Sequence, residues 1–592
     1  MKLIKKVLVI AVIIQLFACG SNSTHNPEIL KEEQFGHIDF LASDSLMGRL
    51  PGTPFDRVAA KYIKDFFEGN RFELLGKNGY QFFEFIDHQD IGDNNSLSIN
   101  KHNKTLGTDY AVFPFSSSDT ISGAVVFVGY GINFKNDSLI WNDFANLNLS
   151  GKWALILRGD PLLDMEKSPF TSIVSDRHKA MVAMEHGAMG TIFVSGHRFD
   201  VKDELVTSKQ KTFPIGIPVL HVNRAMANDI LSGTGKTIKG IENEILSIKK
   251  PISFVSGSNV CARTNIITKR KSTQNVVALV KGSDPLLKHQ YVVVGAHFDH
   301  IGMGGQGSSS RMPDTLAVHN GADDNASGVS AILEIGHKLL HQKPKRSIVV
   351  VAFGAEEMGL LGSRFFVENP LIPLDSIVAM VNIDMLGRLN SENTLQVGGV
   401  KTAVEADSIL NTLNAGYEFS LALAPQGYGP SDHASFYAKN IPVLFFSTGA
   451  HADYHTPNDD IEQINIEGLY KASNYIYDVI SSIANEGSKP TFQEAGPAAP
   501  SSRHGGELKV RLGIMPDVSG VRNDGLQVLA VNSNQPAGLA GIQKGDLITA
   551  LNGHKINNIQ DYMFYLQKLE VGSTVSVEFK RDGKTMVVLA QL

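Results

Sequence analysis

Two adjacent carboxylates, Glu356 and Glu357, close an apolar run in the sequence VVAFGAEEMGLLGS at 349–362. Like charges about 4 Å apart repel by roughly 1 kcal/mol in water and by about 4 kcal/mol near a protein surface. A pair of glutamates on its own usually lies in a solvated loop. A bound cation would instead absorb one charge and leave the other carboxylate for proton transfer, and the rest of the chain decides between these interpretations.

Further ligand-type residues follow other apolar runs. His297 and Asp299 come just past a predicted strand in VVVGAHFDH, and Asp384 ends the strand in MVNIDMLG. Asp324 precedes a predicted helix in NGADDNASG, and His455 follows the strand VLFFST. Imidazole and carboxylate are ligands of zinc and similar divalent metals. This number of donors exceeds what one four-coordinate catalytic zinc needs and fits two metals, about 3.5–4 Å apart, bridged by one carboxylate.

The elements that must position these residues begin near residue 274. The segments NVVALV, YVVVGAHF, RSIVVVAFGA, SIVAMVNIDM and IPVLFFST predict strands, and ASGVSAILEIGHKLLHQ and LGSRFFVEN predict helices between them. This alternation predicts an α/β fold with a mostly parallel sheet flanked by helices. Ligands of such sheets bind outside the carboxyl ends of the strands, so the candidate residues are expected at one edge.

The amino terminus, MKLIKKVLVIAVIIQLFACG, has the features of an export signal. Lysines precede an apolar run at 7–18 that is short for a membrane-spanning helix, which predicts a signal peptide over 1–18. The sequence LFAC resembles the bacterial lipobox, in which the cysteine is lipidated. Cys19 is therefore expected to anchor the chain to a membrane through a tether over 19–27, in the periplasm or at the outer membrane or cell surface of a bacterium; the alternative is an ordinary signal peptide with an incidental cysteine.

Composition bounds the remaining possibilities. The chain has 592 residues, 43% of them hydrophobic, which predicts three or four globular domains. A net charge of −6 and the absence of a long basic block argue against nucleic acid as a partner. Only one cysteine besides Cys19 is present, Cys261, so no intrachain disulfide is possible once Cys19 is modified.

The motifs HFD, GADDNASG, GAEEMGLLGS, NIDMLGR and YHTPND together resemble metallopeptidase family twenty-eight, the aminopeptidase Y and bacterial leucyl aminopeptidase family. The resemblance covers a catalytic domain in two parts, 28–108 and 263–485. It implies the zinc aminopeptidase fold, two Zn²⁺ per chain and peptide substrates.

Transferred residue by residue, the resemblance assigns metal ligands. It makes Asp324 the bridging carboxylate. His297 and Asp384 complete one zinc site, and Glu357 and His455 complete the other.

The resemblance also assigns catalytic roles. Glu356 is expected to be the general base, and Tyr454 to donate to the oxyanion, with simple packing as its alternative. Asp299 is expected to hold the second ring nitrogen of His297. His300 has no assigned role in the family and is expected on the surface or behind the ligands.

Two further modules are expected from similar resemblances. The stretch 109–262, with DFANLNLSGKWALILRGDP and HGAMGTIFV, resembles an inserted, β-rich protease-associated domain. Residues 486–505 are rich in Pro, Gly, Ser and Ala and predict a linker. The segment 506–592, with PAGLAGIQKGDLITALNG, resembles a PDZ domain with a β-barrel-like fold, which could bind a peptide C-terminus as an added strand near RLGI at 511–514.

Several functions stay open at this point. The leading hypothesis is a lipid-anchored zinc aminopeptidase that removes N-terminal residues from peptides in the cell envelope. A carboxypeptidase or dipeptidase is possible on the same fold, since the amine or carboxylate recognition groups are not identifiable from the sequence. Glutaminyl cyclisation is disfavoured by the full two-metal ligand set. A non-catalytic peptide-binding protein on a peptidase scaffold is disfavoured by the intact Glu356.

Overall fold

The computed structural model describes residues 28–136, 139–162, 168–206, 212–495, 509–517, 523–533 and 535–592. The predicted signal peptide, Cys19 and its tether lie outside these residues. The chain divides into a first unit, Met1–Phe82 with Gln274–Gly496, and a second unit, Phe83–Thr273 with Pro497–Leu592. In the described part of the chain, no helix combines the length and the apolar character needed to cross a bilayer.

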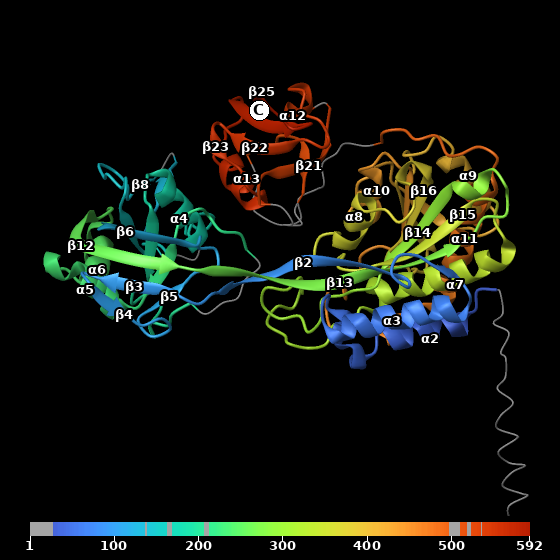
Figure 1. The fold of residues 1–592 in the computed structure, drawn as a ribbon, viewed down its shortest axis with the longest axis horizontal. Helices are drawn as coiled ribbons and strands as arrows, with labels where there is room; N and C mark the ends of the chain where they lie inside the picture. The colour runs from blue at the N-terminus through green and yellow to red at the C-terminus, as the bar shows by residue number, and fades with distance from the viewer. Residues whose placement is uncertain are drawn as a thin grey trace, which may run out of the picture. The chain divides into compact units, whose positions relative to one another are not determined.

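The first unit is built on a nine-stranded sheet in the order β1-β13-β15-β14-β16-β19-β17-β18, with β2 beside β13. Figure 1 labels β2, β13, β14, β15 and β16 of this sheet. Its four neighbouring strands β15, β14, β16 and β19 are parallel to one another, and β13 is antiparallel to β15. The predicted mostly parallel sheet with flanking helices is therefore confirmed. The strands are β1(Glu73–Leu74), β2(Tyr80–Ile91), β13(Ile266–Val280), β14(Tyr291–His297), β15(Ser347–Phe353), β16(Ile377–Ile383), β17(Thr394–Gly398), β18(Ser420–Leu423) and β19(Val443–Ser447).

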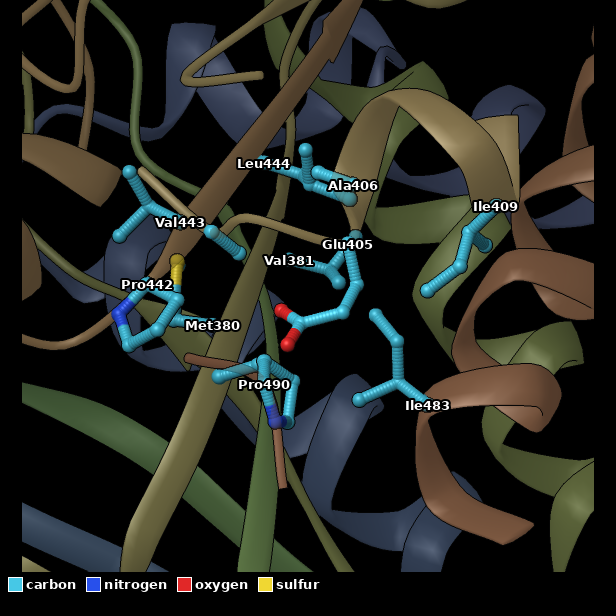
Figure 2. Close-up of a pocket in the computed structure, with 12 residues that line it drawn as sticks. Met380, Val381, Glu405, Ala406, Ile409, Pro442, Val443, Leu444, Ile483 and Pro490 are labelled. Atoms are coloured by element: carbon cyan, nitrogen blue, oxygen red, sulfur yellow. The ribbon is translucent and has the colours of Figure 1, made fainter. Parts of the chain in front are cut away.

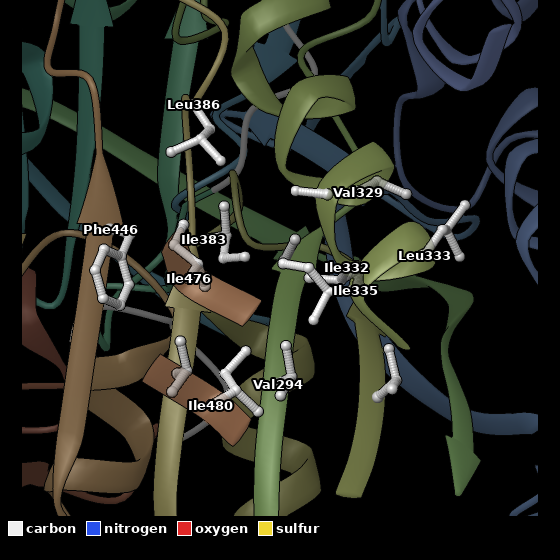
Figure 3. Packing of buried hydrophobic residues seen from close by; sticks show 14 of the residues in the cluster. Val294, Val329, Ile332, Leu333, Ile335, Ile383, Leu386, Phe446, Ile476 and Ile480 are labelled. Carbon is white, nitrogen blue, oxygen red and sulfur yellow. The ribbon is translucent and has the colours of Figure 1, made fainter. Parts of the chain in front are cut away.

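Helices cover both faces of this sheet, which explains why its strands are continuous apolar runs rather than alternating ones. Val292 and Val294 of β14 pack into one core, while Val293 between them packs into the core on the opposite face. The first core is drawn in Figure 3, where Val294 lies among residues of α7 and α11. The helices of this core are α2(Lys31–Leu41), α3(Pro54–Gly69), α7(Gly328–Gln342), α9(Ala406–Asn414) and α11(Ile466–Asn485), and those of the opposite face are α8(Leu361–Glu368) and α10(His433–Tyr437).

The described residues of the second unit form two large sheets and one two-stranded sheet, β7-β8. An eight-stranded sheet has the order β4-β3-β12-β6-β9-β10-β11-β5, and the C-terminal sheet has the order β20-β21-β22-β24-β25, with β23 beside β22. The strands of the first sheet are β3(Ser96–Ile99), β4(His102–Lys104), β5(Tyr110–Val112), β6(Asp119–Val128), β9(Trp153–Leu157), β10(Gly190–Val194), β11(Val219–Val222) and β12(Ser253–Thr264). Those of the second are β20(Ile514–Pro516), β21(Leu526–Val531), β22(Leu547–Leu551), β23(His554–Lys555), β24(Thr574–Arg581) and β25(Lys584–Gln591).

Short elements complete the second unit. The hairpin β7–β8 lies outside the large sheet, and helices follow several of the strands. The strands of the hairpin are β7(Asn133–Lys135) and β8(Ile140–Asn142). The helices are α4(Asp176–Glu185), α5(Arg224–Leu231), α6(Ile238–Ile248), α12(Pro536–Leu539) and α13(Ile559–Leu566).

The structure divides the chain differently from the predicted boundaries at two places. The first part of the catalytic domain was expected to reach residue 108, but the first unit ends at Phe82, because β3 pairs with β12 in the sheet of the second unit. Residues 486–495, expected to begin a linker, belong to the first unit, where Ala495 N–H donates to the Tyr437 hydroxyl at 2.8 Å. The rest of the predicted linker lies outside the described residues.

Candidate metal centre

The carboxyl ends of four parallel strands carry most of the candidate residues. His297 is the last residue of β14, Asp384 directly follows β16, and Glu356 and Glu357 come three and four residues after β15. His455 lies eight residues beyond the end of β19. The predicted convergence at one edge of the sheet is thus observed for residues that are far apart in sequence.

Asp324 comes from the helical turn η4(Ala322–Ser327), directly before α7, and reaches two groups of residues at once. Its Oδ1 lies 3.2 Å from His297 Nε2, which is also 3.3 Å from Asp384 Oδ1. Its Oδ2 lies 3.2 Å from His455 Nε2, which is 3.1 Å from Glu357 Oε2. Each carboxylate oxygen of Asp324 therefore faces a different imidazole, as the bridging role requires.

Several donor atoms of these groups have the surroundings of metal ligands rather than of hydrogen-bonded side chains. Within the described part of the chain, Asp324 Oδ2, Glu357 Oε1 and His455 Nε2 are buried and have no hydrogen-bond partner. Burying charged or polar atoms without a partner is costly, and metal coordination removes that cost. The residue set of imidazoles and carboxylates matches the ligand chemistry of zinc.

His300 was expected on the surface or behind the ligands, and the structure excludes the surface position. Its ring is fully buried and its Nδ1 lies 2.8 Å from Glu357 Oε1. His300, Asp324 and Glu357 form a second set of side chains close enough to share an ion, besides His297, Asp324 and Asp384. The sequence carried a signal, because His300 follows Asp299 directly at the end of β14.

Asp299 holds the second ring nitrogen of His297 through its backbone carbonyl rather than through its carboxylate. The Nδ1 atom of His297 lies 3.2 Å from the backbone carbonyl of Asp299 and 3.8 Å from its carboxylate. The carboxylate instead accepts hydrogen bonds from the backbone N–H groups of Glu356 at 3.0 Å and Glu357 at 3.3 Å. Asp299 thus holds both the ring of His297 and the turn that carries the paired glutamates. Burial raises the pKa of this carboxyl to about 8.

Tyr454 stacks on the ring of its neighbour His455, with ring centroids 3.9 Å apart and planes inclined by 22°. Burial and the surrounding carboxylates raise the pKa of its hydroxyl above the ordinary value, so the hydroxyl keeps its proton at neutral pH. This state is the one a hydrogen-bond donor needs. The role of Tyr454 at the oxyanion stays a prediction.

The charges of the cluster shift its titrations strongly when no metal is bound. Burial opposes charge on His455, but the carboxylates of Asp324 and Glu357 beside its Nε2 outweigh it and raise the pKa of His455 to about 11. Burial likewise opposes charge on His297, yet the charges of Asp384 and Glu356 raise its pKa well above the ordinary value.

Glu356 and Glu357 are shifted in opposite directions despite being adjacent. Burial, reinforced by the charges of Asp432 and Glu357, raises the pKa of Glu356 well above its ordinary value. Burial and the charge of Asp324 act against the charge of Glu357, but the adjacent imidazoles of His300 and His455 lower its pKa to about 2. Of these two adjacent glutamates, Glu357 therefore favours the charged form, whereas Glu356 is suited to carrying a proton.

Arg49 is a buried cation beside the cluster, and the sequence did not predict its position there. The guanidinium of Arg49 donates to the backbone carbonyls of Phe298, Asn320 and Gly321 and is 1% exposed. It thereby ties the turn after β14 to the segment before Asp324. No local pattern signals this role, because a single arginine in LMGRLPG has the spacing of an ordinary surface residue.

The segment 301–319 contributes backbone contacts to His455. The carbonyl of Ser309 lies 2.9 Å from His455 Nδ1, and the N–H of Arg311 donates to the His455 carbonyl at 2.9 Å. A carbonyl at Nδ1 favours the tautomer with its proton there, which leaves Nε2 free to face Asp324 and Glu357.

A separate pocket in the first unit is lined mainly by apolar side chains around Glu405 (Figure 2). Its cavity of about 20 Å³ holds roughly one water molecule, which excludes a peptide. The Glu405 carboxylate already accepts hydrogen bonds from the Thr491 backbone and hydroxyl at 2.9 and 2.7 Å. The pocket is therefore a packing defect rather than a substrate site.

Comparison with known families agrees with the geometry of the cluster. Residues 275–480 match Peptidase family M28, and this range contains all of the candidate ligands. The chain carries a peptidase family M28 domain. Residues 120–230 match the PA domain, the protease-associated module, and residues 510–591 match the PDZ domain. The three predicted family resemblances are confirmed.

Curated relatives include "Aminopeptidase YwaD" of Bacillus subtilis (strain 168), 28% identical over 356 residues, which are 57% of this chain and 64% of that protein. "Leucine aminopeptidase 2" of Arthroderma otae is 25% identical over 253 residues, covering 38% of this chain and 47% of that protein. The match thus spans less than two thirds of either relative. A solved aminopeptidase from Aneurinibacillus sp. strain AM-1 is 20% identical, with 79% of this chain and 96% of that chain covered and a TM-score of 0.45.

Proposed function

We propose that this protein is a zinc aminopeptidase that removes N-terminal residues from peptides with two zinc ions and a glutamate general base. The observation that carries the proposal is the placement of Asp324, whose two oxygens face His297 and His455 separately at 3.2 Å each. The M28 domain and the aminopeptidase names of the relatives support the same reaction.

Each ion has a set of residues to hold it. His297, Asp324 and Asp384 would bind one zinc, and Asp324, Glu357 and His455 would bind the other. When bound, the ions supply Lewis-acid activation of a water molecule and of the substrate carbonyl.

Glu356 would move the proton. Its carboxylate accepts a proton from the attacking water and delivers it to the amine that leaves when the peptide bond breaks. Two features suit Glu356 to proton transfer, since burial makes its carboxylate more basic and Asp299 fixes its backbone through the bond to its N–H. Tyr454, protonated at neutral pH, would donate to the oxygen of the substrate carbonyl.

A matched set of peptides tests the proposal. The protein lacking residues 1–19 is given one peptide with free ends, the same peptide N-acetylated, and the same peptide C-amidated, each with chelator and with zinc restored. Metal-dependent cleavage that requires the free amine supports an aminopeptidase. Cleavage that survives acetylation but not amidation would establish a carboxypeptidase, and no metal-dependent cleavage would favour the binding-protein alternative.

We further propose that the chain works at the bacterial cell envelope, anchored through lipidated Cys19. The lysines, the apolar run and the LFAC sequence support this location. The PDZ domain would bind peptide C-termini by strand addition. Labelling of the chain with radioactive palmitate, lost on replacement of Cys19 by serine, is the expected result for the anchor.

A further inference from the structure

His300 faces the same two carboxylates as His455 but has no part in the ligand sets above. Its Nδ1 is 2.8 Å from Glu357 Oε1 and 3.8 Å from Asp324 Oδ2. The ring is 0% exposed, and neither of its nitrogens has a hydrogen-bond partner among the described residues. A buried imidazole directed at two carboxylates without a hydrogen bond is suited to coordination.

His300, Asp324 and Glu357 each place a donor atom close enough to share an ion, and His455 faces the same two carboxylates. Zinc–ligand bonds of about 2.0–2.2 Å in a tetrahedron separate neighbouring donor atoms by roughly 3.3–3.6 Å. The separations between the imidazole nitrogens of His300 and His455 and the carboxylate oxygens of Asp324 and Glu357 run from 2.8 to 3.8 Å. The rings of His300 and His455 have centroids 5.7 Å apart and planes at 75°, so they approach the shared carboxylates from different directions.

The backbone holds the His300 ring in this position. Gly321 has a φ of +58°, and a Cβ atom there would lie 2.6 Å from Cδ2 of His300 and 2.2 Å from the Asp324 carbonyl. The segment that leads to Asp324 therefore packs against the imidazole through a residue without a side chain. This contact leaves the ring little freedom to turn away from Glu357.

We propose that His300 is a fourth protein ligand at the Glu357–His455 position, and this inference rests on the proposed two-zinc function. That position would then be closed by four protein donors, while the His297–Asp384 position keeps three and an open place for water. Closed zinc sites are typical of tightly held ions and open ones of catalysis. The ion at the closed position is therefore expected to bind more tightly and to exchange more slowly.

The zinc affinity of the His300→Gln variant, measured by chelator competition, tests the inference. Glutamine can contact Glu357 through its side-chain amide but is a poor zinc ligand. Loss of supporting contacts behind a ligand costs about 10–100-fold in metal affinity, so loss of a true ligand is expected to weaken the tighter ion by more than roughly 100-fold. The matched control is His319→Gln, since His319 is a buried histidine of the adjacent loop that contacts Ser310 and the Ala317 carbonyl. An affinity unchanged from wild type in His300→Gln would overturn the inference.

A crystal structure of the zinc-loaded wild-type protein gives an answer without any variant. An Nδ1–zinc distance of about 2.0–2.1 Å for His300 supports the inference, and a distance of roughly 3 Å or more overturns it. These readouts are independent of hydrolysis. If peptides are cleaved but His300 does not bind zinc, only this inference fails; if His300 binds zinc but no peptide is cleaved, only the proposed function fails.

Discussion

At the scale of single residues, the adjacent glutamates 356 and 357 differ in charge behaviour because different neighbours surround them. Glu357 faces His300 and His455, whereas Glu356 lies near His297 and further carboxylates, and its backbone N–H donates to Asp299. The family resemblance assigned Glu357 to the metal and Glu356 to proton transfer, and this assignment stays a prediction. The physical split is visible only when the opposing side chains are in place.

The first prediction concerns Glu356→Gln. Removing the general base is expected to lower kcat by about 10²–10⁴-fold, because the amide cannot accept the proton of the water. Zinc content should be unchanged, since Glu356 is outside both ligand sets. The matched control is Glu368→Gln at the exposed end of α8, which should keep wild-type activity. A Glu356→Gln protein with full kcat would exclude the assigned role.

A second prediction follows from the raised pKa values of the histidines. His455, with a pKa of about 11, and His297, with a pKa well above its ordinary value, are both protonated at pH 7 without metal. Zinc binds neutral imidazole, so loading is expected to release about two protons per chain. Calorimetry in two buffers of different ionisation enthalpy counts them, and a count near zero would contradict the charge state described.

The same shift has a consequence for the zinc-free protein. A folded pKa above the ordinary value of about 6.5 means that His455 stabilises the fold fully below that pH. The contribution is lost as the pH rises toward 11. Zinc-free protein should therefore lose stability over this alkaline range.

At the scale of elements, hydrogen bonds from Asp459 fix the backbone of Asp323 and Asp324 in the candidate site. The carboxylate of Asp459 accepts hydrogen bonds from the backbone N–H groups of Asp323 and Asp324 at 3.0–3.2 Å, and it is fully buried. The guanidinium of Arg388 lies 3.5 Å from the same carboxylate. Asp459 therefore fixes the backbone that presents the bridging residue.

The third prediction is a loss of stability in Asp459→Ala. Each of the two backbone donors left without an acceptor is expected to cost about 1–3 kcal/mol. Thermal unfolding of the zinc-free protein measures the loss. Asp460→Ala is the neighbouring control, because the Asp460 carboxylate accepts a hydrogen bond from the adjacent Ile461 N–H and does not hold the Asp324 backbone. Equal stability of the two variants would show that Asp459 does not support the loop.

Elements were predictable from sequence to the extent that their signals are local. Apolar runs and the residues directly after them located β14, β15, β16 and β19 and the edge where the ligands meet. Pairing of β3 with β12 joins residues more than 150 positions apart, and no local pattern reveals it. The positions of Arg49 and of the His300 ring are not predictable from local patterns either, because both depend on contacts between distant segments.

At the scale of the whole molecule, the first unit contains the complete candidate site and its own core. The segment 486–495 is part of it: Phe492 packs against the core of α8 and α10, and the Thr491 N–H donates to Glu405. The end of this unit is thus close to residue 496 rather than at 485.

The fourth prediction compares two truncated chains. A chain ending after residue 496 should hydrolyse short peptides within about twofold of the full chain, since the site is complete without the PDZ domain. A chain ending after residue 485 should melt earlier, by about 2–4 °C for each kcal/mol of lost packing. Equal melting temperatures would show that residues 486–495 add nothing to the unit. A selective loss on long peptides would indicate that the PDZ domain delivers substrates.

The most direct test of the two-zinc mechanism is a zinc titration of chelated wild-type protein, with peptide hydrolysis measured after each addition. The two groups of ligands around Asp324 predict that activity rises until two equivalents of zinc are bound and is then constant. Saturation at one equivalent would contradict the two-zinc site. Hydrolysis that does not depend on zinc at all would contradict the central claim that this cluster is the catalytic centre.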